Sequence, residues 1–84
     1  MMTMHVLRHG KMRLVEEKIA PNALADGKRL SELNLPDQCN IVSVIRDGNL
    51  LILKTDPILQ TADEVFAIVH EDQKKALARF FNLP

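Results

Sequence analysis

Residues 41–53 read IVSVIRDGNLLIL, and this segment constrains the fold more than any other part of the chain. Two short apolar runs flank an Asp47-Gly48 pair. Such a pair suits the positive φ angles of a two-residue type I′ turn, whose twist matches that of paired antiparallel strands. The sequence therefore predicts a β-hairpin with one strand from Ile41 to Ile45 and the next from Leu50 to Leu53.

Two further segments have the pattern of strands. Residues from Met12 to Ile19 alternate imperfectly, and Pro21 ends the segment because proline cannot donate to a strand ladder. Residues from Glu64 to His70 place three small or branched apolar residues in alternation with Phe66 and Ile68. Such alternation is typical of a strand that covers a core.

Two segments have helical features. Residues from Lys28 to Leu33 follow an Asp26-Gly27 pair, and Asp26 could cap a short helix there. A second helix begins at Glu71, and its apolar stripe consists of Ala76, Leu77, Phe80 and Phe81. The order β-α-β-β-β-α predicts an α+β fold, a mostly antiparallel four-stranded sheet with helices on one face. The other face keeps too many apolar residues to lie in water, so we expect a homodimer.

Composition limits the class of protein. A chain of 84 residues buries only about 60–65 % of its unfolded surface, so it is marginally stable alone. Its single cysteine rules out an intrachain disulfide. Eleven basic and eleven acidic residues cancel, and Trp and Tyr are absent, which argues against nucleic acid as a partner. No apolar run approaches the ~20 residues that span a bilayer, so direct membrane insertion is not expected.

Several sequence motifs, taken in order, resemble the TrkA-C domain, also called the RCK C-terminal domain. GKRLSEL, from Gly27 to Leu33, is similar to the family's GK.L.EL run, and LQTAD, from Leu59 to Asp63, to its LQ.GD. Between and after them lie Pro36, the strand from Ile41 to Ile45 with Arg46 before the turn, and the strand from Val65 to Val69. The resemblance covers residues 12–81. Residues 1–10 are interpreted as a linker or cloned start, and residues 11–84 as one TrkA-C-like domain.

The chain departs from the family pattern at a few positions. Ala62 stands where the family usually has Gly, and Leu53-Lys54 where it often has Pro, which affects local turns more than the fold. The family's nucleotide-binding domain is absent, because nothing reads G-x-G-x-x-G. The stretch at residues 7–10 is similar to the family's inter-domain connector, which favours an excised piece of a larger protein over a stand-alone copy.

Arg46 is the residue with two competing interpretations. It stands directly before the predicted turn, opposite Asn49, where it could form a cross-strand pair at the rim with no ligand. Alternatively, its planar guanidinium could bind a phosphate at a dimer cleft. The resemblance implies a small effector, such as cyclic di-AMP, between two copies of the domain. The implied pocket is lined by Asn40, Ile41 and Val42, with Arg46 near the phosphates; no other cofactor and no metal are expected.

Other polar residues have more ordinary interpretations. Glu16 and Glu17 are adjacent on a strand and point to opposite faces, so they are expected to be solvated rather than an acid–base pair. His5, His9 and His70 lack ligand spacing, and His70 suits a capping role at a strand-to-helix junction. Cys39 precedes a buried strand and is interpreted as a small hydrophobic residue. No nucleophile–base pair or metal triad can be assembled, so an enzyme is not predicted.

These observations predict a cytoplasmic regulatory and ligand-sensing domain. Through the resemblance, it is expected to couple a homodimer to a membrane potassium channel or transporter subunit. One alternative is a purely structural dimerisation module. Another is the regulatory domain of a different transporter, an anion or dicarboxylate carrier or a cation/proton antiporter.

Overall fold

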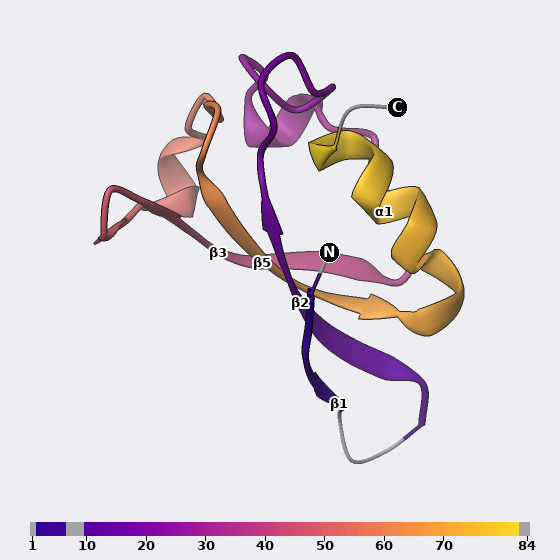
Figure 1. The fold of residues 1–84 in the computed structure, drawn as a ribbon. Helices are drawn as coiled ribbons and strands as arrows, with labels where there is room; N and C mark the ends of the chain where they lie inside the picture. Colours follow the sequence, from indigo (N-terminus) through magenta and orange to yellow (C-terminus); the bar gives the residue numbers. More distant parts are fainter. Residues whose placement is uncertain (1, 7–9, 83–84) are drawn as a thin grey trace.

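The computed structural model describes the backbone of residues 2–6 and all of residues 10–82 (Figure 1). Within these residues, five strands form one sheet in the order β1-β2-β5-β3-β4, and each neighbouring pair is antiparallel. The α-helix of the described part of the chain, α1, lies across one face of this sheet. The strands are β1 (Met2–Val6), β2 (Met12–Lys18), β3 (Cys39–Arg46), β4 (Asn49–Leu50) and β5 (Glu64–His70), and α1 is Lys74–Phe81. The predicted α+β class is confirmed.

The hairpin has the turn that the sequence predicts. Asp47 and Gly48 have φ angles of 51° and 77°, as a type I′ turn requires. Its second strand was expected to reach Leu53, but β4 ends at Leu50 and a 3₁₀ turn follows at Leu53–Thr55. Leu51 and Leu53 pack against the core, so the chain bends inward instead of continuing along the sheet edge.

The helix expected from Lys28 to Leu33 was wrong in extent. Only a 3₁₀ turn, Leu30–Glu32, forms there, and Asp26 does not cap it. A helix of one or two turns is unstable alone, and here the backbone finds partners elsewhere. The Lys28 carbonyl accepts from the Leu59 amide at 2.8 Å, which takes this backbone out of a helical ladder.

Residues 2–6, expected as part of a linker, form the edge strand β1. It pairs with β2 from Met2 opposite Glu16 to Val6 opposite Arg13. Within the described residues, the sheet therefore contains the four predicted strands and one more at its edge. The extra strand was missed because its Met- and His-containing sequence lacks a clear alternation.

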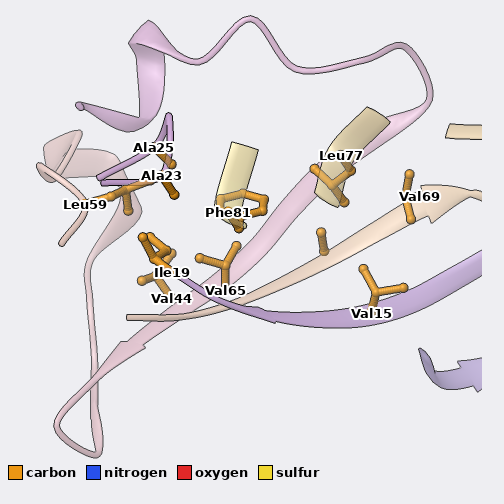
Figure 2. Packing of buried hydrophobic residues seen from close by; sticks show 11 residues of the cluster. Val15, Ile19, Ala23, Ala25, Val44, Leu59, Val65, Val69, Leu77 and Phe81 are labelled. Atoms are coloured by element: carbon orange, nitrogen blue, oxygen red, sulfur yellow. The ribbon is translucent and has the colours of Figure 1, made fainter. Parts of the chain in front are cut away.

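The core lies between α1 and the sheet, as Figure 2 shows. Leu77 and Phe81, four residues apart on the helix, are fully buried against valines of the central strands. The carbonyl of Phe81 accepts from the Ala20 amide at 2.8 Å, which anchors the end of the helix on the loop after β2. The other core residues are Val15, Ile19, Ala23, Ala25, Val44, Leu59, Val65, Ala67 and Val69.

The face of the sheet opposite α1 carries a band of apolar side chains. The ladder pairs Leu14 with Ile68 and Ile45 with Leu50 on this side, and Phe66 lies between them along β5. No helix among the described residues covers these side chains, and Leu50 is 64 % exposed. We call these five residues the open face.

Candidate functional site

The predicted site residues at the start of β3 surround a β-bulge. Ile41 lies opposite Ala67 and Ser43 opposite Phe66, so Val42 is the extra residue of the bulge. Val42 is 47 % exposed, and Asn40 is exposed on the side of the open face. Ile41 instead packs against the core. Asn40 and Val42 are therefore accessible, whereas Ile41 is half-buried.

Arg46 lies at the opposite end of β3, about 13 Å along the strand from Val42 at ~3.3 Å per residue. It stands opposite Asn49 in the ladder, but its side chain contacts a residue that the sequence interpretation did not consider. Its Nε and Nη2 donate to the two carboxylate oxygens of Asp63, each at 2.8 Å. Nη2 also donates to the Ile58 carbonyl at 2.9 Å. Within one chain, the structure does not bring Arg46 together with Asn40 and Val42.

The Arg46–Asp63 pair is strongly asymmetric in burial. The Asp63 side chain is 1 % exposed, whereas that of Arg46 is 28 % exposed. The hydrogen bonding of the guanidinium to Asp63, where Arg46 is the donor, raises the pKa of Arg46 and favours its charged form. A buried carboxylate without its partner is costly, so removing Arg46 is expected to cost about 3–5 kcal/mol. Nη1 makes no hydrogen bond to any residue that the structure describes, which leaves one edge of the guanidinium open.

Asp63 also organises the turn that leads into β5. Its carboxylate accepts from the Gln60 amide at 2.9 Å, and its own carbonyl accepts from the Ile19 amide at 3.0 Å. Ala62, just before it, donates to the Ile19 carbonyl at 2.7 Å with a φ of 73°. This left-handed conformation is the one for which glycine is favoured. The turn thus keeps the geometry of a glycine turn with alanine in its place.

Two loop segments, 26–31 and 56–61, run side by side next to Asp63, and we call them the loop pair. The Gly27 amide donates to the Leu59 carbonyl at 2.8 Å, and the Leu30 amide to the Pro57 carbonyl at 3.2 Å. A β-bridge joins Arg29 and Ile58 between these bonds. The two sequence motifs, GKRLSEL and LQTAD, therefore mark two segments that hold each other through backbone hydrogen bonds.

Two aspartates close the ends of the loop pair. Asp26 accepts from the Thr61 hydroxyl at 2.9 Å and from the Asn22 amide at 3.0 Å. Asp56 accepts from both the amide and the hydroxyl of Ser31, at 2.8 and 2.6 Å. These hydrogen bonds lower the pKa of both carboxyl groups, the Asn22 amide acting first on Asp26 and the Ser31 hydroxyl on Asp56.

The remaining candidates divide between confirmed and corrected interpretations. The capping role of His70 is confirmed, because its Nδ1 accepts from the Asp72 amide at 3.1 Å. Glu17, expected to be solvated, is 1 % exposed and accepts from the Asn82 side chain at 3.0 Å. It faces the core because it alternates in register with buried Val15.

Cys39 is half-buried, and burial raises the pKa of its thiol, which agrees with a small packing residue. Among the residues that the structure describes, no group of three or more acidic, His or Cys side chains could hold a metal ion. The side chain of His5 and the whole of His9 lie outside the described residues.

A family comparison defines the class to which this fold belongs. The TrkA-C domain matches residues 14–82, which is most of the chain, so the chain belongs to the TrkA-C domain family. Within residues 2–6 and 10–82, no helix is long and apolar enough to cross a membrane.

Curated relatives carry a consistent name. The chain is 29 % identical over 75 residues to a Trk system potassium uptake protein TrkA homolog of Archaeoglobus fulgidus, covering 89 % of this chain and 17 % of that protein. It is 29 % identical over 76 residues to a protein of the same name from Methanothermobacter thermautotrophicus, covering 90 % and 35 %. A Methanosarcina mazei Trk system potassium uptake protein trkA homolog 1 is 26 % identical over 72 residues, covering 86 % and 18 %. The chain therefore spans between about a sixth and a third of the length of these relatives.

Proposed function

We propose that this chain is a cytoplasmic regulatory domain of a potassium transport system. The observation that carries the proposal is the family match over residues 14–82, supported by relatives named for potassium uptake. The partner would be a membrane potassium channel or transporter subunit. A change in the domain would reach that partner as a shift between two arrangements, which a ligand can cause only by binding them unequally.

The proposed active unit is a homodimer that buries the open face. Leu14, Ile45, Leu50, Phe66 and Ile68 gather there without a covering helix among the described residues. A contiguous apolar patch on the surface of a small domain is typical of a site that binds another protein or another copy of the same chain. A second copy supplies a matching apolar face, because a two-fold interface brings the same patch from both subunits.

The proposed effector is a small anionic nucleotide, such as cyclic di-AMP, at the dimer cleft. Accessible Asn40 and Val42 support a contact at the bulge, and the open edge of Arg46 supports a contact to a phosphate. Ile41 would contribute an apolar wall from its half-buried position. Since Arg46 lies about 13 Å from Val42 in one chain, the site would combine the bulge of one copy with Arg46 of the other.

The hydrogen bonds of Arg46 favour a second candidate, a purely structural dimerisation module. Its guanidinium already holds Asp63 and the Ile58 carbonyl, so no ligand is needed to satisfy it. Calorimetric titration with cyclic di-AMP separates the two functions. Saturable heat with one nucleotide per two chains supports the sensing domain, and no heat with this or linear nucleotides supports the structural module.

The transport assignment needs a separate experiment in the native host. Replacing buried Val65 with Asp should disrupt the domain, and an altered rate of potassium uptake in that strain is expected. The matched control is Asn34→Asp, a charge of the same sign at an exposed loop position, which should leave uptake unchanged. Unchanged potassium uptake with altered transport of dicarboxylates or protons would instead support a carrier or antiporter of another type.

A further inference from the structure

We propose that the Arg46–Asp63 contact is the link through which the β3–β4 hairpin controls the packing of the loop pair. The inference rests on the proposed regulatory function, because a regulatory domain must carry a change at its contact surface to another part of the molecule. Arg46 and Asp63 would carry that change. Neither the family match nor the names of the relatives assign them this role.

The hairpin side of the link is a single side chain. Within residues 45–50, Arg46 alone among the described residues uses its side chain to hydrogen-bond outside the hairpin. The same hairpin presents Leu50, and just beyond it Ile52, at 64 % and 61 % exposure. A partner that contacts these apolar side chains would therefore act on Arg46 within a few residues of the contact.

The loop side of the link lies in the middle of the loop pair. Arg46 bonds the Ile58 carbonyl, and Ile58 is the residue that bridges to Arg29 on the opposite segment. The residues on either side of Ile58 receive the backbone bonds from Gly27 and Leu30. The guanidinium thus holds the segment at the point where it pairs with its neighbour.

Burial makes the contact behave as one unit rather than as separate weak bonds. Without Arg46, the Asp63 carboxylate at 1 % exposure keeps, among the described residues, only the hydrogen bond from the Gln60 amide, and a buried charge without a charged partner is strongly unfavourable. Asp63 lies two residues after segment 56–61, so hydrating its carboxylate is expected to displace that segment from the core. Loss of the two hydrogen bonds between Arg46 and Asp63 should therefore open the loop pair while the strands of the sheet stay paired.

Amide hydrogen exchange on the full 84-residue chain tests this link. The reporters are the amides of Gly27, Leu30 and Leu59, which bond across the loop pair, and the reference is the β2–β5 ladder. Arg46→Lys keeps the positive charge but cannot form both hydrogen bonds to Asp63. It should speed exchange of the reporter amides about tenfold more than exchange of the ladder amides. The control, Arg13→Lys, makes the same substitution in an ion pair with a single hydrogen bond, to the partly exposed Glu71 at the other end of the sheet, and should leave that ratio unchanged.

A change in the Asp47-Gly48 turn then tests whether a perturbation of the hairpin reaches the loop pair through Arg46. Gly48 has a φ of 77° and open space where a Cβ would lie, so Gly48→Ala strains the backbone without a clash. This variant should speed exchange of the three reporters in the wild-type background and add nothing in the Arg46→Lys background. Two results would overturn the proposal. One is an equal change in reporter exchange for Arg46→Lys and Arg13→Lys, and the other is an undiminished effect of Gly48→Ala on reporter exchange in the Arg46→Lys background. A monomeric chain that binds no effector would remove the proposed function and leave this exchange result standing.

Discussion

The guanidinium of Arg46 holds the buried carboxylate of Asp63 through two hydrogen bonds of equal length, 2.8 Å each, between residues 17 positions apart. Parallel bonds of this kind between charged groups are stronger than neutral ones and fix the relative orientation of both side chains. The contact joins the end of β3 to the start of β5, two neighbouring strands. We therefore expect this ion pair, with its buried carboxylate, to matter more for the stability of the fold than a fully exposed ion pair would.

Replacing Arg46 with Ala should destabilise the domain by about 3–5 kcal/mol, because it strands the charge of Asp63 in the core. Urea unfolding followed by circular dichroism measures the loss. Arg13→Ala is the matched control, since its partner Glu71 is 37 % exposed, and there we expect no more than about 1 kcal/mol. Similar losses in the two variants would contradict the structural role assigned to Asp63.

Ala62→Gly should stabilise the chain by about 0.5–1 kcal/mol. Ala62 has a φ of 73°, and the left-handed region costs a residue with a Cβ more than it costs glycine. Thermal unfolding should show a higher midpoint temperature. The reverse change, Gly27→Ala at a φ of 85°, should lower the midpoint, since a Cβ there meets no neighbouring atom and only the backbone conformation is penalised. A lower midpoint for Ala62→Gly would show that the side-chain methyl outweighs the strain.

Phe66→Glu should convert a homodimer to a monomer. The ring of Phe66 lies in the centre of the open face, and a carboxylate there would be buried in an apolar interface without a partner. Sedimentation velocity at micromolar concentration measures the change. Asn34→Glu adds the same charge at an exposed loop residue and should remain dimeric. A wild-type chain that already sediments as a monomer would refute dimerisation through this face.

Stability should fall in acid through the ends of the loop pair. Hydrogen bonds lower the folded-state pKa of Asp26 and Asp56, so both groups contribute stability above the unfolded pKa of about 3.9. That contribution is lost as pH falls below about 4 and through the lower folded-state pKa of each group. Midpoint temperatures measured from about pH 7 to about pH 2 should fall less steeply in the Asp26→Asn, Asp56→Asn double variant. Parallel curves for the two proteins would mean that other carboxylates dominate acid unfolding.

Local patterns in the sequence predicted the parts of the fold that depend on near neighbours. The Asp47-Gly48 turn, the strand from Glu64 to His70 and the buried pair Leu77 and Phe81 follow from turn chemistry, alternation and helical spacing. Strand β1 and the loop pair depend instead on backbone bonds to distant segments. No periodicity in either partner records such pairing.

The candidate site was predicted only in part for the same reason. Arg46 was expected either to bind a phosphate or to form a cross-strand pair opposite Asn49, and its actual side-chain partner, Asp63, was treated only as part of a family motif. One signal was available: an arginine at the end of one apolar strand and an aspartate at the start of another can meet if the strands are neighbours. The bulge at Val42 leaves no such trace, because strand alternation on both sides of it looks regular by itself.

The bulge at Val42 is a place where this strand can lose a residue without exchanging its two faces. Ile41 lies opposite Ala67 and Ser43 opposite Phe66, which are neighbours on β5, so deleting Val42 would make the ladder regular and leave both pairings intact. A deletion elsewhere in the strand would instead exchange the faces of the residues on one side of it. Length variation among related chains is therefore expected in the loops or at this bulge.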